Sequence, residues 1–165
     1  MTDYDGRSDA AITGAAMKAI RTERRMGRSE VAAAMGLAPS TYDHLEAGRG
    51  KITFDRLKRF AAATNCDVIA LMACVPLRDP LFALHCADNK AASILLMAYS
   101  ELHEKIGADL MFIDIKTMVG AAAKLCRELE EHLAKRDLFA ERWIDATTAK
   151  ITGSPIAGLR RRPLK

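Results

Sequence analysis

The chain has 165 residues, of which 50% are hydrophobic and 5% aromatic, and its formal net charge is +4. No apolar run reaches the roughly 18 residues that a membrane-spanning helix needs, and the polar start of the chain lacks the basic-then-apolar order of a secretion signal, so we expect a soluble, cytoplasmic protein. The abundance of Ala, Leu, Met, Lys, Arg and Glu favours an all-α fold.

The first 27 residues predict a disordered start followed by one helix. Residues 1–8 are polar and lack periodicity, and we expect them to be disordered. A helix is then predicted over about residues 9–25, because apolar side chains recur on one face at helical spacing. These side chains are Ile12, Ala16, Met17 and Ile20. Gly27 interrupts the pattern.

The stretch Ser29–Gly48 reads as two short helices joined at Gly36. The first is predicted over residues 28–35, and Gly36 can supply the positive φ that ends it. The second is predicted to begin at Pro39, because proline is tolerated at the first helical position. Tyr42 and Leu45 face inward in this helix, which leaves Ser40, Thr41, Asp43, His44 and Ala47 on the side toward solvent or a ligand.

Two further helices are predicted before residue 75. After a basic loop that holds Arg49 and Lys51, a fourth helix begins near Thr53, and Asp67 can cap a short fifth one that ends near Met72. Between Met17 and Phe60, ten Lys or Arg stand against five Asp or Glu, a balance that suits a polyanionic partner.

Several of these residues coincide with one family pattern. Ile20 to Asn65 resembles the XRE family, the Cro and lambda-repressor type of helix-turn-helix regulators. The matching positions are Arg21 paired with Glu46, Val31, Ala32 and Gly36, Pro39-Ser40-Thr41, Leu45-Glu46-x-Gly48, and Leu57 with Ala61. The resemblance implies a five-helix lambda-repressor-like DNA-binding domain over residues 9–75. Ala38 departs from it, since Ser or Thr is usual at that N-cap.

The resemblance also implies roles for individual side chains. It places Pro39, Ser40, Thr41 and His44 at base-contacting positions, where short polar groups can enter the major groove. It places Arg28, Arg49, Lys51 and Thr53 near phosphates. Arg21 and Glu46 are expected to form a structural pair between the first and third helices.

The second half of the chain predicts architecture rather than chemistry. Val75–Pro80 contains two prolines and is the predicted boundary of a helical dimerisation or interaction domain over residues 79–152. One helix is predicted from Pro80 to Ile106, a second from Asp109, and a third over about residues 137–150. The second has a heptad-like apolar seam: Met111, Ile115, Met118, Ala122, Leu125, Leu129 and Leu133. Residues 153–165 are predicted to be a flexible basic tail.

Motifs for catalysis or cofactor binding are not recognisable in the sequence. Cys66, Cys74, Cys86 and Cys126 form no CxxC pair, and we expect reduced thiols. His85-Cys86 and His103-Glu104 match no metal-site spacing. No glycine-rich phosphate loop or nucleophile elbow is present, so we expect neither an enzyme nor a cofactor.

The sequence therefore favours a sequence-specific transcriptional regulator, a repressor that binds DNA as a homodimer. An alternative is an antitoxin-like or adaptor protein whose C-terminal helices bind another protein. A third interpretation, a ligand pocket lined by Met97, Met111, Met118 and Trp143, has less support, because such side chains usually belong to a plain core.

Overall fold

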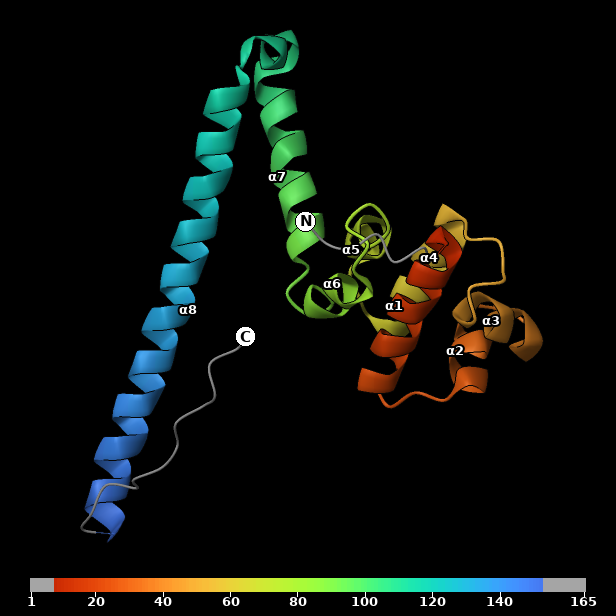
Figure 1. The fold of residues 1–165 in the computed structure, drawn as a ribbon, viewed down its shortest axis with the longest axis horizontal. Helices are drawn as coiled ribbons and strands as arrows, with labels where there is room; N and C mark the ends of the chain where they lie inside the picture. Colours follow the sequence, from red (N-terminus) through yellow and green to blue (C-terminus); the bar gives the residue numbers. More distant parts are fainter. Residues whose placement is uncertain (1–7, 153–165) are drawn as a thin grey trace. The chain divides into compact units, whose positions relative to one another are not determined.

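The computed structural model describes residues 8–152, and over residues 136–152 it describes the backbone alone. All regular structure in this range is helical, which confirms the all-α class (Figure 1). The elements are α1 (Asp9–Glu23), α2 (Arg28–Ala34), α3 (Pro39–Glu46), α4 (Phe54–Thr64), α5 (Val68–Ala73), α6 (Pro80–His85), α7 (Ala91–Ile106), the 3-10 helix η1 (Gly107–Phe112) and α8 (Ile115–Thr152). Of the residues expected to be disordered, 1–7 lie outside the described residues, as does the predicted basic tail 153–165. Ser8, which was expected to be disordered too, is instead the N-cap of α1.

The chain divides into two compact units after Gly107. The first unit thus extends past the boundary predicted at residues 75–79. It does so because α6 packs against α1, and α7 packs against α5. The second unit contains α8.

Local signals explain where most helices of the first unit begin. The hydroxyl of Ser8 accepts a hydrogen bond from an amide of α1, and the hydroxyl of Thr53 does the same for α4. The carboxylates of Asp67 and Asp79 cap α5 and α6. These caps satisfy amides that have no partner within the helix. Ala38 supplies no side-chain cap to α3.

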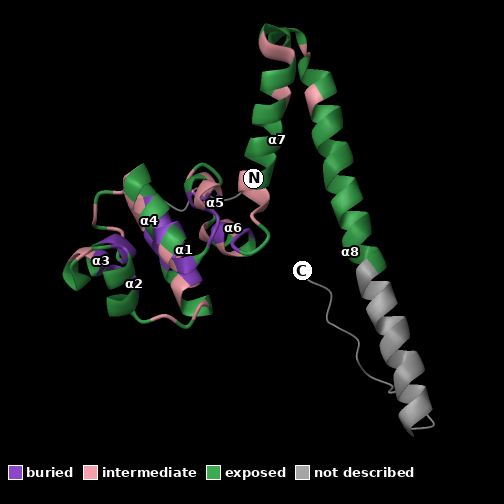
Figure 2. Cartoon of the chain, turned by 180° about the vertical axis from the view of Figure 1, so that it is seen from behind, coloured by how far each residue is buried: buried purple, intermediate pink, exposed green. Residues whose placement is uncertain are grey.

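The core of the first unit lies among α1 to α6, where the buried residues gather (Figure 2). The side chains of Ile12, Ile20, Val31, Tyr42, Leu45 and Phe60 are all fully buried. The rings of Tyr42 and Phe60 stack with centroids 6.5 Å apart. This contact packs the inner face of α3 against α4.

Two glycines allow α1 and α3 to approach closely. A Cβ added to Gly14 would lie 2.6 Å from the carbonyl oxygen of Glu46, and one added to Gly48 would lie 2.6 Å from the Cα of Ala11. Gly48 also has a φ of +70°, which glycine adopts without steric cost. Larger residues at these positions would push the two helices apart.

An ion pair connects the same two helices. Arg21 on α1 donates hydrogen bonds from Nη2 to Glu46 Oε1 at 2.6 Å and from Nε to Oε2 at 3.1 Å. The Glu46 side chain keeps only 5% of its surface exposed, and that of Arg21 13%. A third hydrogen bond runs from Arg21 Nη1 to the carbonyl of Met26 at the end of the α1–α2 turn. The guanidinium thus holds α1, the turn and α3 together.

Asp67 joins two further helices. Besides capping α5, its carboxylate accepts hydrogen bonds from the backbone amide and the hydroxyl of Ser93, in the first turn of α7, at 3.0 and 2.6 Å. Burial raises the pKa of this carboxyl, but the hydrogen bonds from Ser93 and from two α5 amides outweigh that effect, and the pKa is lowered. One buried carboxylate therefore stabilises the start of both α5 and α7.

The C-terminal helices differ from the sequence-based expectation in their boundaries. The single helix expected over residues 80–106 is interrupted, because Lys90 has a φ of +54° and Asn89 Oδ1 accepts a hydrogen bond from the amide of Ala91, which starts α7 anew. The helix expected from Asp109 begins only at Ile115, after η1. The separate helix expected over residues 137–150 is part of α8, since no glycine or proline interrupts residues 121–152.

Exposed apolar side chains characterise both of the long helices. In α7 they include Ile94, Leu95, Leu96 and Met97, and in α8 Ile115, Val119, Leu125, Leu129 and Leu133. No helix among the described residues is long and apolar enough to span a membrane.

Replacing Arg21 by Ala should lower the free energy of unfolding by about 3 to 5 kcal/mol, because the buried Glu46 carboxylate loses both of its hydrogen bonds and keeps only the longer contact with Arg28. Urea denaturation of the full chain, followed by circular dichroism, measures this change. The matched control is Asp55→Ala, which breaks the exposed ion pair with Arg59 on α4 and should cost less than about 1 kcal/mol. Equal costs for the two variants would contradict the structural role of Arg21.

Replacing Asp67 by Ala should lower the free energy of unfolding by about 2 to 3 kcal/mol near neutral pH, because both helix starts lose their carboxylate acceptor. The folded-state pKa lies below the unfolded one, so this stabilisation is complete above the usual aspartate pKa and is lost as the pH falls below about 4. The difference between wild type and variant should therefore shrink in acid. A difference that is independent of pH would contradict the role of the ionised carboxylate.

Candidate nucleic-acid interface

The turn between α2 and α3 holds two short helices in a fixed relation. Gly36 has a φ of +65°, and the amide of Leu37 donates a hydrogen bond to the carbonyl of Ala32, which ends α2. Val31 and Ala32 of α2 are fully buried in the core that also contains Tyr42 and Leu45 of α3. The inner face of α3 is thus occupied, and its other face is left to solvent.

This outward face of α3 consists of the exposed residues Pro39, Ser40, Asp43, His44 and Ala47. They recur at the i, i+3 and i+4 spacing of one helix face. Of the four predicted base contacts, the structure brings Pro39, Ser40 and His44 together on it. Thr41 is half-buried at its edge. The side chains on this face are short and most of them are polar, which suits entry of the helix into a DNA groove.

The predicted phosphate contacts have different surroundings. Arg49 and Lys51 are exposed in the loop that follows α3. The hydroxyl of Thr53 accepts a hydrogen bond from the amide of Arg56 at 3.3 Å as the cap of α4. Arg28, at the start of α2, has its Nε 3.8 Å from Asp43 Oδ1 and 3.7 Å from Glu46 Oε2.

A hollow of about 320 Å³ lies beside the outward face of α3. It is lined by Lys18, Arg28, Asp43, Glu46, Ala47 and Arg49. Lys18 was not among the residues predicted from the sequence. Its position on α1, three residues before Arg21, places it near α3 only through the packing of the two helices. Three cationic side chains thus surround the two carboxylates of α3.

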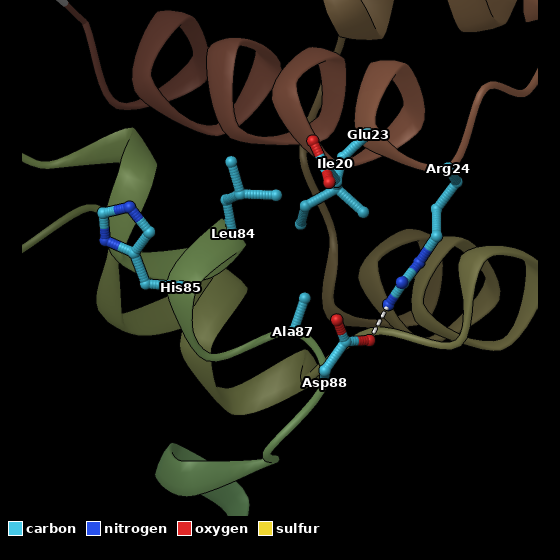
Figure 3. Close-up of a pocket in the computed structure, with 7 residues that line it drawn as sticks. All are labelled: Ile20, Glu23, Arg24, Leu84, His85, Ala87 and Asp88. Carbon is cyan, nitrogen blue, oxygen red and sulfur yellow. Dashed lines mark hydrogen bonds and ion pairs between the residues drawn. The ribbon is translucent and has the colours of Figure 1, made fainter. Parts of the chain in front are cut away.

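A second hollow, of about 260 Å³, lies between the end of α1 and α6 (Figure 3). Arg24 crosses it to pair with Asp88 at 2.5 Å and also donates to the carbonyl of Thr64 at the end of α4. The guanidinium holds the pKa of the Asp88 carboxyl below its usual value. We assign these contacts to the attachment of the segment after α6 to α1 and α4, because Arg24 and Asp88 pair with each other across the hollow.

Comparison with known proteins identifies the segment that contains α2 and α3. The helix-turn-helix family model matches residues 17–71. No curated protein matches the chain.

Two solved chains of the clp gene regulator ClgR from Corynebacterium glutamicum are similar to this chain. One is 21% identical over 44% of this chain and 94% of its own, with a TM-score of 0.41. The other is 18% identical over 61% of this chain and 96% of its own, with a TM-score of 0.40.

The family match covers the residues whose geometry is described above: the α2–α3 pair, the buried inner face of α3 and its exposed polar face. Residues 17–71 of this chain are therefore a helix-turn-helix domain of the XRE type.

Proposed function

We propose that this protein is a sequence-specific DNA-binding transcriptional regulator that acts as a homodimeric repressor. The observation that carries this proposal is the presentation of α3. Its inner face is buried and locked by the Arg21–Glu46 pair, while Pro39, Ser40 and His44 lie exposed on its outward face. A rigid helix with short polar side chains can enter the major groove without rearrangement.

In the proposed complex, α3 lies in the major groove, and the loop after it lies along the sugar-phosphate backbone. Ser40 and His44 contact base edges, with Pro39 and Thr41 beside them. Arg49 and Lys51 bind phosphates, because both are exposed and cationic. Arg28, with 58% of its side chain exposed, and Thr53, at the amide-rich start of α4, are further phosphate contacts in this proposal.

The homodimer is supported by exposed apolar residues outside the helix-turn-helix domain. Leu125, Leu129 and Leu133 follow one another at four-residue spacing on α8, each more than a third exposed. Burying such residues against a second copy removes apolar surface from water. Two copies would present two α3 helices to half-sites about 34 to 36 Å apart. Occupancy of such a site would repress transcription by blocking the promoter.

The second candidate function is an antitoxin-like or adaptor protein, and α7 favours it. Ile94, Leu95, Leu96 and Met97 are consecutive and all about half exposed or more. Because consecutive helical residues point in different directions, apolar surface extends around much of this helix, as in helices that other chains enclose. A monomer in isolation that copurifies with a stoichiometric partner protein would favour this candidate.

Selection of bound duplexes from random DNA tests the proposed function directly. We expect a two-fold symmetric consensus. Replacing Ser40 or His44 by Ala should weaken binding to the consensus and relax preference at single base positions, by about 1 to 3 kcal/mol each. Replacing Arg49 or Lys51 by Ala should weaken binding to every sequence and reduce the salt slope by about one unit. If the variants of the two sets changed affinity and base preference in the same way, these roles would be contradicted.

Replacing Leu129 by Glu should lower the affinity of self-association by at least about tenfold, because a charge would have to be desolvated in the interface. Sedimentation equilibrium of the full chain measures this. The control is Lys124→Gln, which alters an exposed residue that pairs with Glu128 along the same helix. A wild-type chain that remains monomeric would refute the homodimer.

A further inference from the structure

Asp43 is the one acidic residue on the outward face of α3. It lies three residues after Ser40 and directly before His44, so it shares this face with predicted base contacts. Its side chain is 48% exposed, whereas those of Tyr42 and Leu45 on the inner face are fully buried. Any surface that α3 presents to DNA therefore includes the Asp43 carboxylate.

Arg28 lies beside this carboxylate. Its Nε lies 3.8 Å from Asp43 Oδ1 and 3.7 Å from Glu46 Oε2, which are distances of ion pairs rather than of hydrogen bonds. Glu46 is itself held by two hydrogen bonds from Arg21. Arg28 therefore lies between the buried carboxylate of Glu46 and the exposed carboxylate of Asp43. The Asp43 carboxylate thus has a cationic neighbour on α2.

The positive and negative charges of the four side chains that meet here are equal in number. Arg21 and Arg28 carry two positive charges, and Asp43 and Glu46 carry two negative ones. Lys18 and Arg49, which line the same hollow, leave its surroundings cationic. DNA can therefore approach α3 although a carboxylate lies on the outward face. When DNA covers this face, burying the carboxylate costs free energy unless a hydrogen-bond donor of the DNA contacts it.

The major groove offers such donors at only two of the four bases. Guanine presents the acceptors N7 and O6, and thymine presents the acceptor O4, so both repel a carboxylate. Adenine presents its N6 amino group beside the acceptor N7. Cytosine presents its N4 amino group with an acceptor on one side only, the O6 of the paired guanine, whereas the adenine N6 group lies between its own N7 and the O4 of the paired thymine. Cytosine is therefore the base that best matches Asp43.

We propose that Asp43 is a specificity-determining residue that accepts a hydrogen bond from the N4 amino group of a cytosine, and that Arg28 is its positioning residue. This inference rests on the DNA-binding function proposed above. Ser and His can each donate or accept, so Ser40 and His44 tolerate several base edges. Asp43 can only accept, and it therefore excludes bases by charge.

The test compares duplexes selected from random DNA by the full-length wild type and by two variants. The wild type should require a C·G pair at one position of each half-site. Asp43→Ala should reduce this preference about tenfold and leave the other positions unchanged. Asp43→Asn keeps the shape of the side chain and adds an amide donor, so an A·T pair should become acceptable at that position, because an amide can pair with both N6 and N7 of adenine. Because both substitutions lie on an exposed face, circular dichroism should show unchanged folding.

The matched control for charge is Asp55→Ala. Asp55 is an exposed aspartate on α4 that pairs with Arg59 at 2.9 Å, and it lies outside the outward face of α3. Its removal changes the net charge as Asp43→Ala does. It should raise affinity for all sequences without altering the base preference.

Arg28→Gln separates positioning from phosphate binding. If Arg28 positions Asp43, the cytosine preference should fall severalfold in this variant, whereas loss of a phosphate contact alone would lower affinity uniformly and leave the preference intact. That second result would overturn the role of Arg28.

The remaining outcomes also decide between the two proposals. A wild type that enriches no sequence refutes the proposed function. A wild type that enriches a consensus refutes only the role of Asp43 if Asp43→Ala selects the same consensus, or if the Asp43-dependent position is an A·T pair.

Discussion

The orientation of α3 depends on one buried ion pair. Arg21 and Glu46 meet through two hydrogen bonds, with Glu46 almost fully excluded from solvent. Because either charge alone would be costly at this depth, α1 and α3 are held in one arrangement. Gly14 and Gly48 permit the close approach that the pair requires. The ion pair thereby determines which side of α3 faces the core, and the polar side then faces solvent.

Asp67 extends this order into the rest of the first unit. Its carboxylate accepts hydrogen bonds from two amides of α5 and from the amide and hydroxyl of Ser93 in α7. The start of α7 is thus fixed to the last helix of the helix-turn-helix segment, although most of α7 is exposed. The contacts of α6 with α1 and of Arg24 with Asp88 act in the same direction. The contacts of Asp67 with Ser93, of α1 with α6 and of Arg24 with Asp88 all join residues on opposite sides of residues 75–79.

Local signals in the sequence predict the elements before residue 75 closely. Proline at the start of α3, glycine after α2 and aspartate before α5 each act on the backbone within one turn, so they can be recognised without tertiary contacts. The later elements were predicted less well. Lys90 adopts a positive φ that nothing in its sequence neighbourhood requires, and the run from residue 121 offers no signal that distinguishes one long helix from two.

The sequence by itself determined the helical class, the helix-turn-helix pattern and the side chains available on α3, because periodicity and capping are local properties of the chain. Only the tertiary structure decided that Lys18 and Arg28 surround the two carboxylates of α3, that Asp43 shares the outward face with Arg28 beside it, and that Asp67 joins α5 to α7. These relations join residues from different helices, and their distances follow from how the helices pack rather than from spacing along the chain.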